Sequence, residues 1–248
     1  MTPPLPPLPP NAALRWAVVQ ELLPADAVDV LEIGCGQGAV GARLARRYRY
    51  LGVEQDPDSH AVASERITRA HPTAEVVLAD AGTLPTDASF DLVCAFEVIE
   101  HIEDDRGALE QWAARLRPGG TLLLSTPSSP HRYGPADTLA GHYRRYEPRA
   151  LAGLLTDVGL EDPRVRSFGM PLGYLLETGR NAVAKRRLAE LDGTSLEERT
   201  AGSGRHLQPR SPWLGRAVTV AVSPFALVQR AFPGRGPGLV ATARRPTG

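Results

Sequence analysis

Short apolar runs alternate with amphipathic segments along most of the chain, and glycine, proline or aspartate usually separates them. Apolar runs of this length predict buried strands, whereas apolar residues spaced three and four apart predict helices. The predicted strands span residues 28–33, 48–54, 74–80, 90–96, 121–126, 164–169 and 238–245. Because strands that are apolar on both faces are typical of parallel sheets between two helical layers, the pattern predicts an α/β fold with a doubly wound sheet.

Helices are predicted between these strands, each with one apolar face. They span residues 11–23, 39–48, 57–71, 104–117 and 147–160. Asn11 is the expected N-cap of the first helix, and Pro57 is expected in the first turn of the third. The sequence Pro-Gly-Gly at 118–120 is expected to end the fourth.

The spacing of the strands divides the chain into four parts. Residues 1–10 are a Pro-rich flexible arm, residues 11–168 a core, and residues 238–248 a final strand and tail. The part between, residues 169–237, is a connection of about 70 residues, which is far longer than most loops. We therefore predict a helical insertion that forms a lid or wall of the functional site.

Two helices are predicted within this insertion, at residues 173–192 and 212–232, with the polar stretch 193–210 between them.

The composition is that of an ordinary globular protein: 248 residues, 42% hydrophobic and 23% charged. Cys35 and Cys94 lie in apolar or Gly-rich surroundings, which predicts reduced, buried thiols and a cytoplasmic protein. The first residues lack the basic and apolar regions of a secretion signal. The longest apolar run near the C-terminus contains Pro224 and is too short to span a bilayer, so we expect no transmembrane segment.

The formal net charge of zero conceals a division along the chain. Residues 1–163 carry 14 basic and 23 acidic side chains, a balance of −9, whereas residues 164–248 carry 14 basic and 5 acidic ones, a balance of +9. We interpret the basic excess as attraction between the two parts and as a source of solubility. The alternative is a surface for an anionic substrate, RNA or lipid headgroups. Since the whole chain has no basic excess, a nucleic-acid partner is not favoured.

A glycine-rich turn, VLEIGCGQGAVG, leads from the first predicted strand to the next helix. Gly34, Gly36 and Gly38 permit a tight turn and a close approach of a ligand to the main chain. The stretch from Gly36 to Gly41 also fits the G-x-G-x-x-G pattern of dinucleotide-binding folds, and Glu54 lies 20 residues after Gly34. These features alone leave an NAD-dependent oxidoreductase as an alternative.

With Glu32 before the first glycine, the turn reads E-x-G-x-G-x-G and resembles motif I of the class I S-adenosylmethionine (SAM)-dependent methyltransferases. The resemblance covers residues 28–168. It includes GVEQD and LADAGTLP after the second and third strands, FDLVCAFEVIEHI at the fourth, and RLRPGGTLLLSTPS leading into the fifth. It implies a Rossmann-like sheet of seven strands, here with the helical insertion before the last one. In this family the last two strands usually form a close hairpin, which the insertion interrupts.

The resemblance also implies SAM as the cofactor and the residues that hold it. Glu32 orders the glycine turn, the carboxylate of Glu54 accepts bonds from both ribose hydroxyls, and Asp80 lies near the adenine amine. The implied cofactor residues are Glu32, Gly34, Gly36, Gly38, Glu54, Gln55, Asp80, Ala81, Ala95 and Phe96.

The stretch CAFEVIEHIEDD, residues 94–105, continues from strand to carboxylates around a histidine. Glu97, Glu100 and His101 share one face if a helix begins there. His142 follows the fifth strand and is expected across the same crevice, because ligands of an open parallel sheet bind at the carboxyl ends of its strands.

This set is similar to that of the metal-dependent small-RNA 3′-terminal 2′-O-methyltransferases, and ubiquinone-pathway O-methyltransferases have a related motif. The resemblance implies that Glu97, Glu100, His101 and His142 bind a divalent metal such as Mg²⁺ or Mn²⁺. The alternative is that the acids are helix-start charges. In that case His142 or His101 is the general base, and Arg144 and Arg145 suit an acidic acceptor.

We therefore predict a cytoplasmic SAM-dependent methyltransferase of the ubiquinone-pathway O-methyltransferase-like type. Its expected acceptor is a small molecule with an oxygen nucleophile, bound beside the insertion. The alternatives are an RNA 2′-O-methyltransferase with a metal site, an NAD-dependent oxidoreductase, and a SAM-binding protein without catalytic activity.

Overall fold

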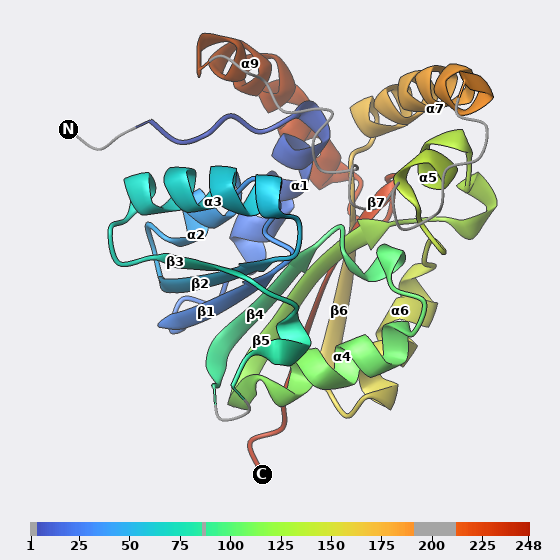
Figure 1. Ribbon diagram of the computed structural model, residues 1–248. Helices are drawn as coiled ribbons and strands as arrows, with labels where there is room; N and C mark the ends of the chain where they lie inside the picture. Colours follow the sequence, from blue (N-terminus) through green and yellow to red (C-terminus); the bar gives the residue numbers. More distant parts are fainter. Residues whose placement is uncertain (1–3, 86–87, 191–211) are drawn as a thin grey trace.

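The computed structural model of the protein describes residues 4–85, 88–190 and 212–248. Seven strands form one sheet in the order β3–β2–β1–β4–β5–β7–β6 (Figure 1). Their bounds are β1 Asp29–Ile33, β2 Arg49–Glu54, β3 Glu75–Leu78, β4 Phe90–Phe96, β5 Leu116–Pro127, β6 Glu161–Phe168 and β7 Gly238–Arg244. Each coincides with one predicted strand, so the predicted seven-stranded α/β fold is confirmed.

The sheet is mixed. Strands β1 to β5 run parallel, whereas β7 is antiparallel to both β5 and β6. In the pair of β6 and β7, Glu161 lies opposite Arg244 and Phe168 opposite Gly238. The two strands thus form the antiparallel pair that is usual in the family although residues 169–237 separate them. The reversed β7 distinguishes this sheet from the parallel sheet of dinucleotide-binding folds.

Helices cover both faces of the sheet, as predicted (Figure 1). The helices on one face are α1 Pro10–Leu22, α2 Gly41–Leu44, α3 Pro57–Ala70 and α9 Pro212–Val228; those on the other are α4 Asp105–Ala114 and α6 Pro148–Asp157. Neighbouring residues of a strand point to opposite faces. Val30 therefore belongs to one buried cluster and Leu31 to the other.

Some helix boundaries differ from the predictions. Pro9, not Asn11, precedes α1, and Asn11 lies in the first turn. Helix α2 ends at Leu44 because residues 45–48 turn back toward β2 and bury Tyr48. Pro57 does begin α3, capped by the carboxylate of Asp56.

The segment before and after β5 also differs. Residues 118–120 belong to β5, since the strand begins at Leu116, which pairs with Phe90 ahead of a bulge. The stretch after β5 contains a short helix, α5 Pro135–Ala140, which the hydrophobic pattern did not indicate.

The N-terminal arm packs against the domain where it is described. Leu8 is only 4% exposed and belongs to a core cluster. Arg43 Nη1 donates a hydrogen bond to the carbonyl of Pro6 at 2.9 Å. These contacts differ from the flexible arm that we predicted for residues 1–10, because Leu8 packs among apolar side chains of the core.

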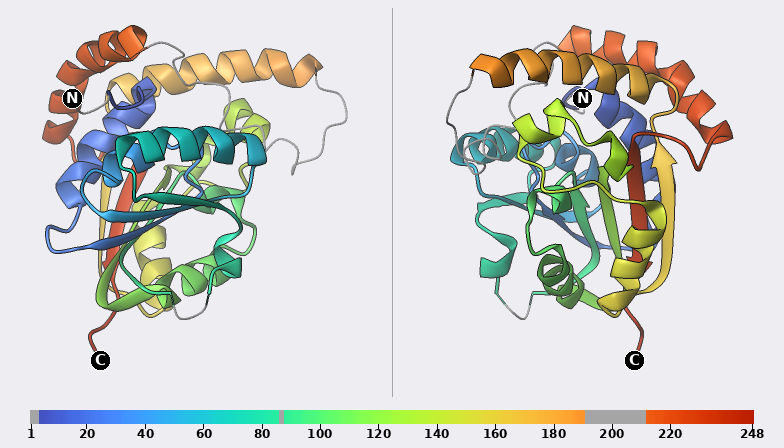
Figure 2. Two further views of the ribbon diagram at one scale, coloured as in Figure 1. Left: turned by 60° about the vertical axis from the view of Figure 1, so that its left-hand side comes forward. Right: turned by 90° about the vertical axis from the view of Figure 1, so that its right-hand side faces the viewer.

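The insertion begins with α7 Leu172–Glu190 and ends with α9, in agreement with the predicted helices. The predicted polar stretch 193–210 lies outside the described residues. Since β6 runs parallel to β5, α7 starts at the end of the sheet where the parallel strands finish, and α5 packs against it. Figure 2 shows α7 and α9 as the outermost elements at that end. Within the described ranges, no helix combines the length and hydropathy that crossing a bilayer requires.

Candidate functional site

The turn between β1 and α2 has a backbone that favours glycine. Gly34, Gly36 and Gly38 have φ angles of 63°, 55° and 75°, in the left-handed region that side chains disfavour. A β-carbon at Gly38 would lie 2.9 Å from Ile67 and 3.0 Å from Ala63 of α3, whereas one at Gly36 would meet no atom within 4 Å. The turn is therefore packed at Gly38 and open at Gly36.

Glu54, the last residue of β2, holds this turn in place. Its Oε2 accepts a hydrogen bond from the backbone N–H of Gly36 at 2.7 Å, and its Oε1 accepts bonds from Gln55 and Asp56 at 3.0 Å each. Gln55 Nε2 in turn donates to Asp80 Oδ2 at 2.6 Å. The residues predicted to hold the ribose and adenine thus join the glycine turn in one hydrogen-bonded group at adjacent strand ends.

Glu32 lies beneath the turn and is 2% exposed. Its Oε2 accepts a hydrogen bond from Tyr50 Oη at 2.6 Å. Burial raises the pKa of Glu32 to about 8, although this bond and the charge of Arg15 act in the opposite direction. A β-carbon at Gly41 would lie 2.8 Å from Glu32 Oε2. Glu32 therefore shapes the turn by packing against its far end.

The end of β4 completes this side of the site. Ala95 and Phe96 are 1% and 8% exposed, and Ala81 begins a 3₁₀ turn after β3 that Asp80 caps. The guanidinium of Arg15, from α1, lies 5.6 Å from the centre of the Phe96 ring. The sequence reasoning missed Arg15, because nothing near it indicates a contact with a strand end far along the chain.

The segment after β4 is not the α-helix that the spacing assumed. Glu97 has a left-handed φ of 58°, and Ile99–His101 form a single 3₁₀ turn, while α4 begins only at Asp105. Glu97 Oε1 lies 3.3 Å from Arg15 Nη1 and accepts a bond from Ser125 Oγ at 2.8 Å. Because of this turn, the Glu97 carboxylate contacts Arg15 and Ser125 and does not join Glu100 and His101.

The other three predicted metal ligands do come together. One ligand atom each from Glu100, His101 and His142 lie within 4.8 Å of one another. Glu100 is fully buried, and its Oε2 accepts a bond from Thr126 Oγ1 at 3.1 Å. Glu100 Oε1 and His101 Nδ1 are buried and have no hydrogen-bond partner among the described residues.

Burial controls the charge of this cluster. It raises the pKa of the Glu100 carboxyl well above its usual range, and the nearby Glu97 adds to the effect. It also lowers the pKa of His101 to about 4, with a contribution from His142. In the absence of a cation, burial therefore favours the neutral form of both groups.

The ring of His142 packs against the ring of His101, and Asp137 fixes its orientation. The two rings meet edge to face, with centres 4.6 Å apart, and His142 Nδ1 lies 2.8 Å from Asp137 Oδ1. Asp137 is 1% exposed. Although burial alone would raise the pKa of Asp137, the bonds from His142 and Arg145 lower it to about 2. The carboxylate therefore holds Nδ1–H and leaves Nε2 free for chemistry.

Asp137 is itself fixed by a buried ionic network. Arg145 donates to both of its oxygens, at 2.9 and 2.7 Å, and also pairs with Glu177 of α7. Glu177 pairs with Arg132 as well. The sequence analysis missed both acids: the only signal for Asp137 is its position five residues before His142, and no local signal connects Glu177 to it.

The two arginines predicted to orient an acceptor are engaged by the protein. Arg145 belongs to this network. Arg144 donates to the Glu103 carbonyl at 2.6 Å and pairs with Asp105. Neighbouring carboxylates and a carbonyl thus use many of their N–H groups, and a role toward an acceptor stays a prediction.

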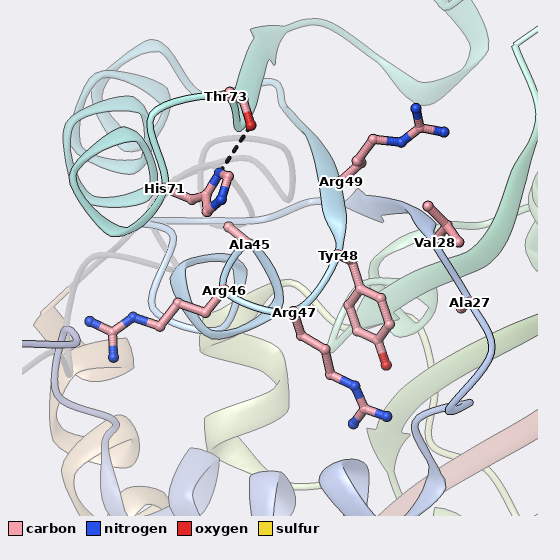
Figure 3. Close-up of a pocket in the computed structure, with 9 residues that line it drawn as sticks. All are labelled: Ala27, Val28, Ala45, Arg46, Arg47, Tyr48, Arg49, His71 and Thr73. Atoms are coloured by element: carbon pink, nitrogen blue, oxygen red, sulfur yellow. Dashed lines mark hydrogen bonds between the residues drawn. The ribbon is translucent and has the colours of Figure 1, made fainter. Parts of the chain in front are cut away.

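A separate hollow of about 300 Å³ lies at the opposite end of the sheet, near the start of β1 and β2 (Figure 3). Arg46, Arg47 and Arg49 line it, but their guanidinium groups point away from one another. Arg49 pairs with Asp29 at 2.6 Å. None of the predicted site residues lies in its lining.

Residues 30–120 match the family described as "Methyltransferase domain". A probable S-adenosylmethionine-dependent methyltransferase of Mycobacterium tuberculosis is 39% identical over 151 residues, which cover 58% of this chain and 53% of that protein. A ubiquinone biosynthesis O-methyltransferase of Bradyrhizobium diazoefficiens is 32% identical over 98 residues, 39% of each chain. The chain thus spans about half the length of the first relative and less of the second.

The fold has close counterparts among solved structures. A SAM-dependent methyltransferase of Thermotoga maritima superposes with a TM-score of 0.57 at 19% identity, over 95% of this chain and 89% of that one. This likeness concerns the fold. The strand order with its reversed β7, the glycine turn with its strand-end acids, and the related sequences agree. Residues 30–120 are therefore a methyltransferase domain, and the relatives and the fold support a class I S-adenosylmethionine-dependent methyltransferase.

Proposed function

We propose that the protein binds SAM along the ends of β1, β2 and β3 and transfers its methyl group to an oxygen nucleophile of a small molecule. The observation that carries this proposal is the hydrogen-bonded group of Gly36, Glu54, Gln55 and Asp80. It places an open main-chain turn beside two carboxylates at adjacent strand ends. The relatives named SAM-dependent methyltransferases support the cofactor.

Each part of this group suits one part of SAM. The space at Gly36 allows the amino-acid portion to approach the main chain. Glu54 Oε1 already accepts two backbone bonds, whereas Oε2 accepts only one, and since a carboxylate oxygen has two acceptor sites, Oε2 keeps one for a ribose hydroxyl. Asp80 suits the adenine amine.

His142 is the group that we assign as general base. The acceptor oxygen attacks the methyl carbon, the carbon–sulfur bond breaks with its electrons on sulfur, and S-adenosylhomocysteine leaves. The acceptor proton passes to His142 Nε2, since Asp137 occupies Nδ1. His101, with a pKa of about 4, is too weak a base for this step and instead accepts a hydrogen bond from the bound acceptor.

The choice of an oxygen acceptor is supported by the relative named a ubiquinone biosynthesis O-methyltransferase. The insertion supplies the wall of the acceptor site, because α7 packs against α5 close to His142. The side chains of α7 are therefore where we expect acceptor specificity to be determined.

A divalent metal is a second candidate element of this site. The unpartnered Glu100 Oε1 and His101 Nδ1 favour it, as does the Asp137–His142 pair, since metal-binding histidines usually donate their other N–H to a carboxylate. One carboxylate and two imidazoles fit Mn²⁺ better than Mg²⁺, which prefers oxygen ligands. Such an ion would lower the pKa of an acceptor hydroxyl. Glu97 is not part of this set.

Calorimetric titration of Mn²⁺ into protein loaded with S-adenosylhomocysteine tests the metal. Binding near one equivalent that is lost in His101→Ala would support it, and the RNA 2′-O-methyltransferase alternative would then merit assay. Unchanged binding in His101→Ala would contradict it.

Calorimetric titration with S-adenosylhomocysteine tests the cofactor site. Glu54→Gln should weaken binding roughly 10- to 100-fold, because it replaces the charged acceptor of several hydrogen bonds. Glu75→Gln, at the opposite end of neighbouring β3, is the matched control and should bind as the wild type does. No binding by the wild type, or equal binding by Glu54→Gln, would refute the proposed cofactor site.

A further inference from the structure

Helix α9 carries apolar side chains on two opposite faces. On the inner face Val222 is 4% exposed and joins a core cluster, with Val218 and Phe225 packed against it. On the outer face Val220 and Leu227 are 72% and 66% exposed. A helix that is apolar all around ordinarily has apolar surroundings on every side. Within the described part of the chain, α9 has them on one side only.

Exposed apolar side chains are concentrated on this part of the molecule. Of the eleven large apolar residues that are exposed in the described ranges, six belong to the insertion, and we call them the α7–α9 surface. They are Leu175, Val183, Val220, Leu227, Val228 and Phe232. Figure 1 and both views of Figure 2 show α7 and α9 as the outermost elements at the same end of the molecule.

Basic side chains predominate beside this surface, where the acid Glu21 of α1 pairs with Arg230. Lys185, Arg186 and Arg187 of α7 and Arg235 after α9 are exposed, and none of them forms an ion pair with a side chain that the structure describes. Residues 217–235 contain no acid. Glu177 of α7 is buried and paired with arginines. The surface is thus apolar and cationic.

We propose that the α7–α9 surface docks on an anionic lipid bilayer. Aliphatic side chains enter the boundary between headgroups and acyl chains, and neighbouring cations meet anionic headgroups. This pairing uses both properties of the surface. The basic excess of residues 164–248 also favours an anionic partner.

Other binding partners would match either the apolar or the cationic side chains of this surface, but not both. In a two-fold contact with a second copy, the cations of one chain would face the same cations of the other. An RNA backbone would attract the arginines, but it offers nothing to Val220 and Leu227. A bilayer, unlike a folded partner, can bind α7 and α9 without a surface of complementary shape.

Helix α7 belongs both to the α7–α9 surface and to the candidate site, so docking would hold the site close to the bilayer. Helix α7 supplies Glu177, which pairs with Arg145, and Arg145 holds Asp137. The ends of the parallel strands lie at the same end of the molecule. The docking surface does not depend on the proposed function, and its test requires no methyl transfer.

Sedimentation of the 248-residue chain with vesicles tests the proposal. We expect binding to vesicles of phosphatidylcholine mixed with phosphatidylglycerol, little binding to phosphatidylcholine alone, and weaker binding as salt increases. The double variant Val220→Glu/Leu227→Glu should bind roughly tenfold more weakly or worse, since it removes apolar side chains and adds anions. Both positions are exposed, so the fold should persist, which circular dichroism would verify.

Matched variants separate the two contributions. Val28→Glu, at a position 53% exposed at the opposite end of the sheet, should leave vesicle binding unchanged. Changing Lys185, Arg186 and Arg187 to glutamine should reduce binding by about fivefold for each cation removed.

Three results would overturn the proposal. They are the absence of vesicle binding, equal binding by Val220→Glu/Leu227→Glu, and equal binding to both kinds of vesicle. A dimer that Leu227→Glu dissociates, in protein that does not bind vesicles, would identify the surface as a contact between copies of the chain.

Discussion

Asp137 Oδ1 lies 2.8 Å from His142 Nδ1, and both oxygens of the same carboxylate accept hydrogen bonds from Arg145. One short segment after β5 therefore provides the proposed base, its orienting acid and the cation that fixes the acid. Because Asp137 is buried and ionised, the proton of a neutral His142 stays on Nδ1. The orientation of the imidazole is set by the folded chain before an acceptor binds.

Replacing Asp137 with asparagine should lower kcat for methyl transfer by roughly 10²- to 10⁴-fold, the range associated with general bases. The amide no longer requires the proton on Nδ1, so Nε2 loses its basic lone pair in part of the population. Nitrogen NMR shifts of His142 report this change of tautomer independently of activity. The matched control is Asp157→Asn on α6, an exposed position, which should change neither quantity. An unchanged tautomer in Asp137→Asn would contradict the assignment.

Replacing Glu177 with glutamine should reduce the free energy of unfolding by roughly 3–5 kcal/mol, because it leaves a buried guanidinium without its full countercharge. Arg145 and Glu177 are 7% and 2% exposed, so solvent screens their interaction little. Urea denaturation measures the change. Glu65→Gln, which removes an exposed pair with Arg69 on α3, should cost below about 1 kcal/mol. Equal losses in the two variants would show that the network is solvated.

The strands and the cofactor side of the site were predictable from the sequence because both depend on local patterns. Continuous apolar runs fix buried strands, and parallel strands bring their carboxyl ends to one edge. Glu54 and Asp80 thus came together as expected. The sequence left the pairing of β6 and β7 open, and the structure shows that the two strands pair despite the long insertion between them.

The acceptor side was predicted less well, because long-range contacts and one backbone angle decide it. The left-handed φ of Glu97 breaks the helical face that its spacing suggested. Arg145, which one alternative assigned to an acidic acceptor, pairs with Glu177, 32 residues away. Neither a positive φ at a non-glycine residue nor a buried ion pair between distant segments has a sequence pattern of its own.

Alanine at Gly36 and alanine at Gly38 should have different consequences. Both residues have left-handed φ angles, so each substitution costs about 1–2 kcal/mol of folding free energy. At Gly38 the added methyl also collides with Ala63 and Ile67 of α3, which adds roughly 1–3 kcal/mol. At Gly36 it enters the open space that we assign to SAM.

Thermal unfolding and titration with S-adenosylhomocysteine distinguish the two variants. Gly38→Ala should be the less stable protein, and Gly36→Ala should lose more affinity than its change in stability explains. If Gly36→Ala binds as tightly as the wild type, the space beside Gly36 is not the cofactor site.

The stability of the protein should fall as pH rises from about 4.5 to about 8, through the buried carboxyl of Glu32. Its pKa increases from an ordinary value of 4.5 to about 8 on folding. Between these values the folded state keeps a proton that the unfolded state has released, and stability decreases with pH wherever the folded state binds more protons. Below pH 4.5 both states are protonated and this loss is absent; above pH 8 the loss is complete, on the order of 5 kcal/mol at most.

Urea denaturation of the wild type and Glu32→Gln across this range measures the effect. The difference in unfolding free energy between the two proteins should shift in favour of Glu32→Gln as pH increases, and become constant above pH 8. Tyr50→Phe provides a second test, because the bond from Tyr50 Oη holds the pKa of Glu32 down. Its loss should extend the pH-dependent range upward. Parallel pH profiles for the wild type and Glu32→Gln would mean that Glu32 keeps its ordinary pKa in the folded protein, and hence that water or a cation reaches the carboxylate beneath the glycine turn.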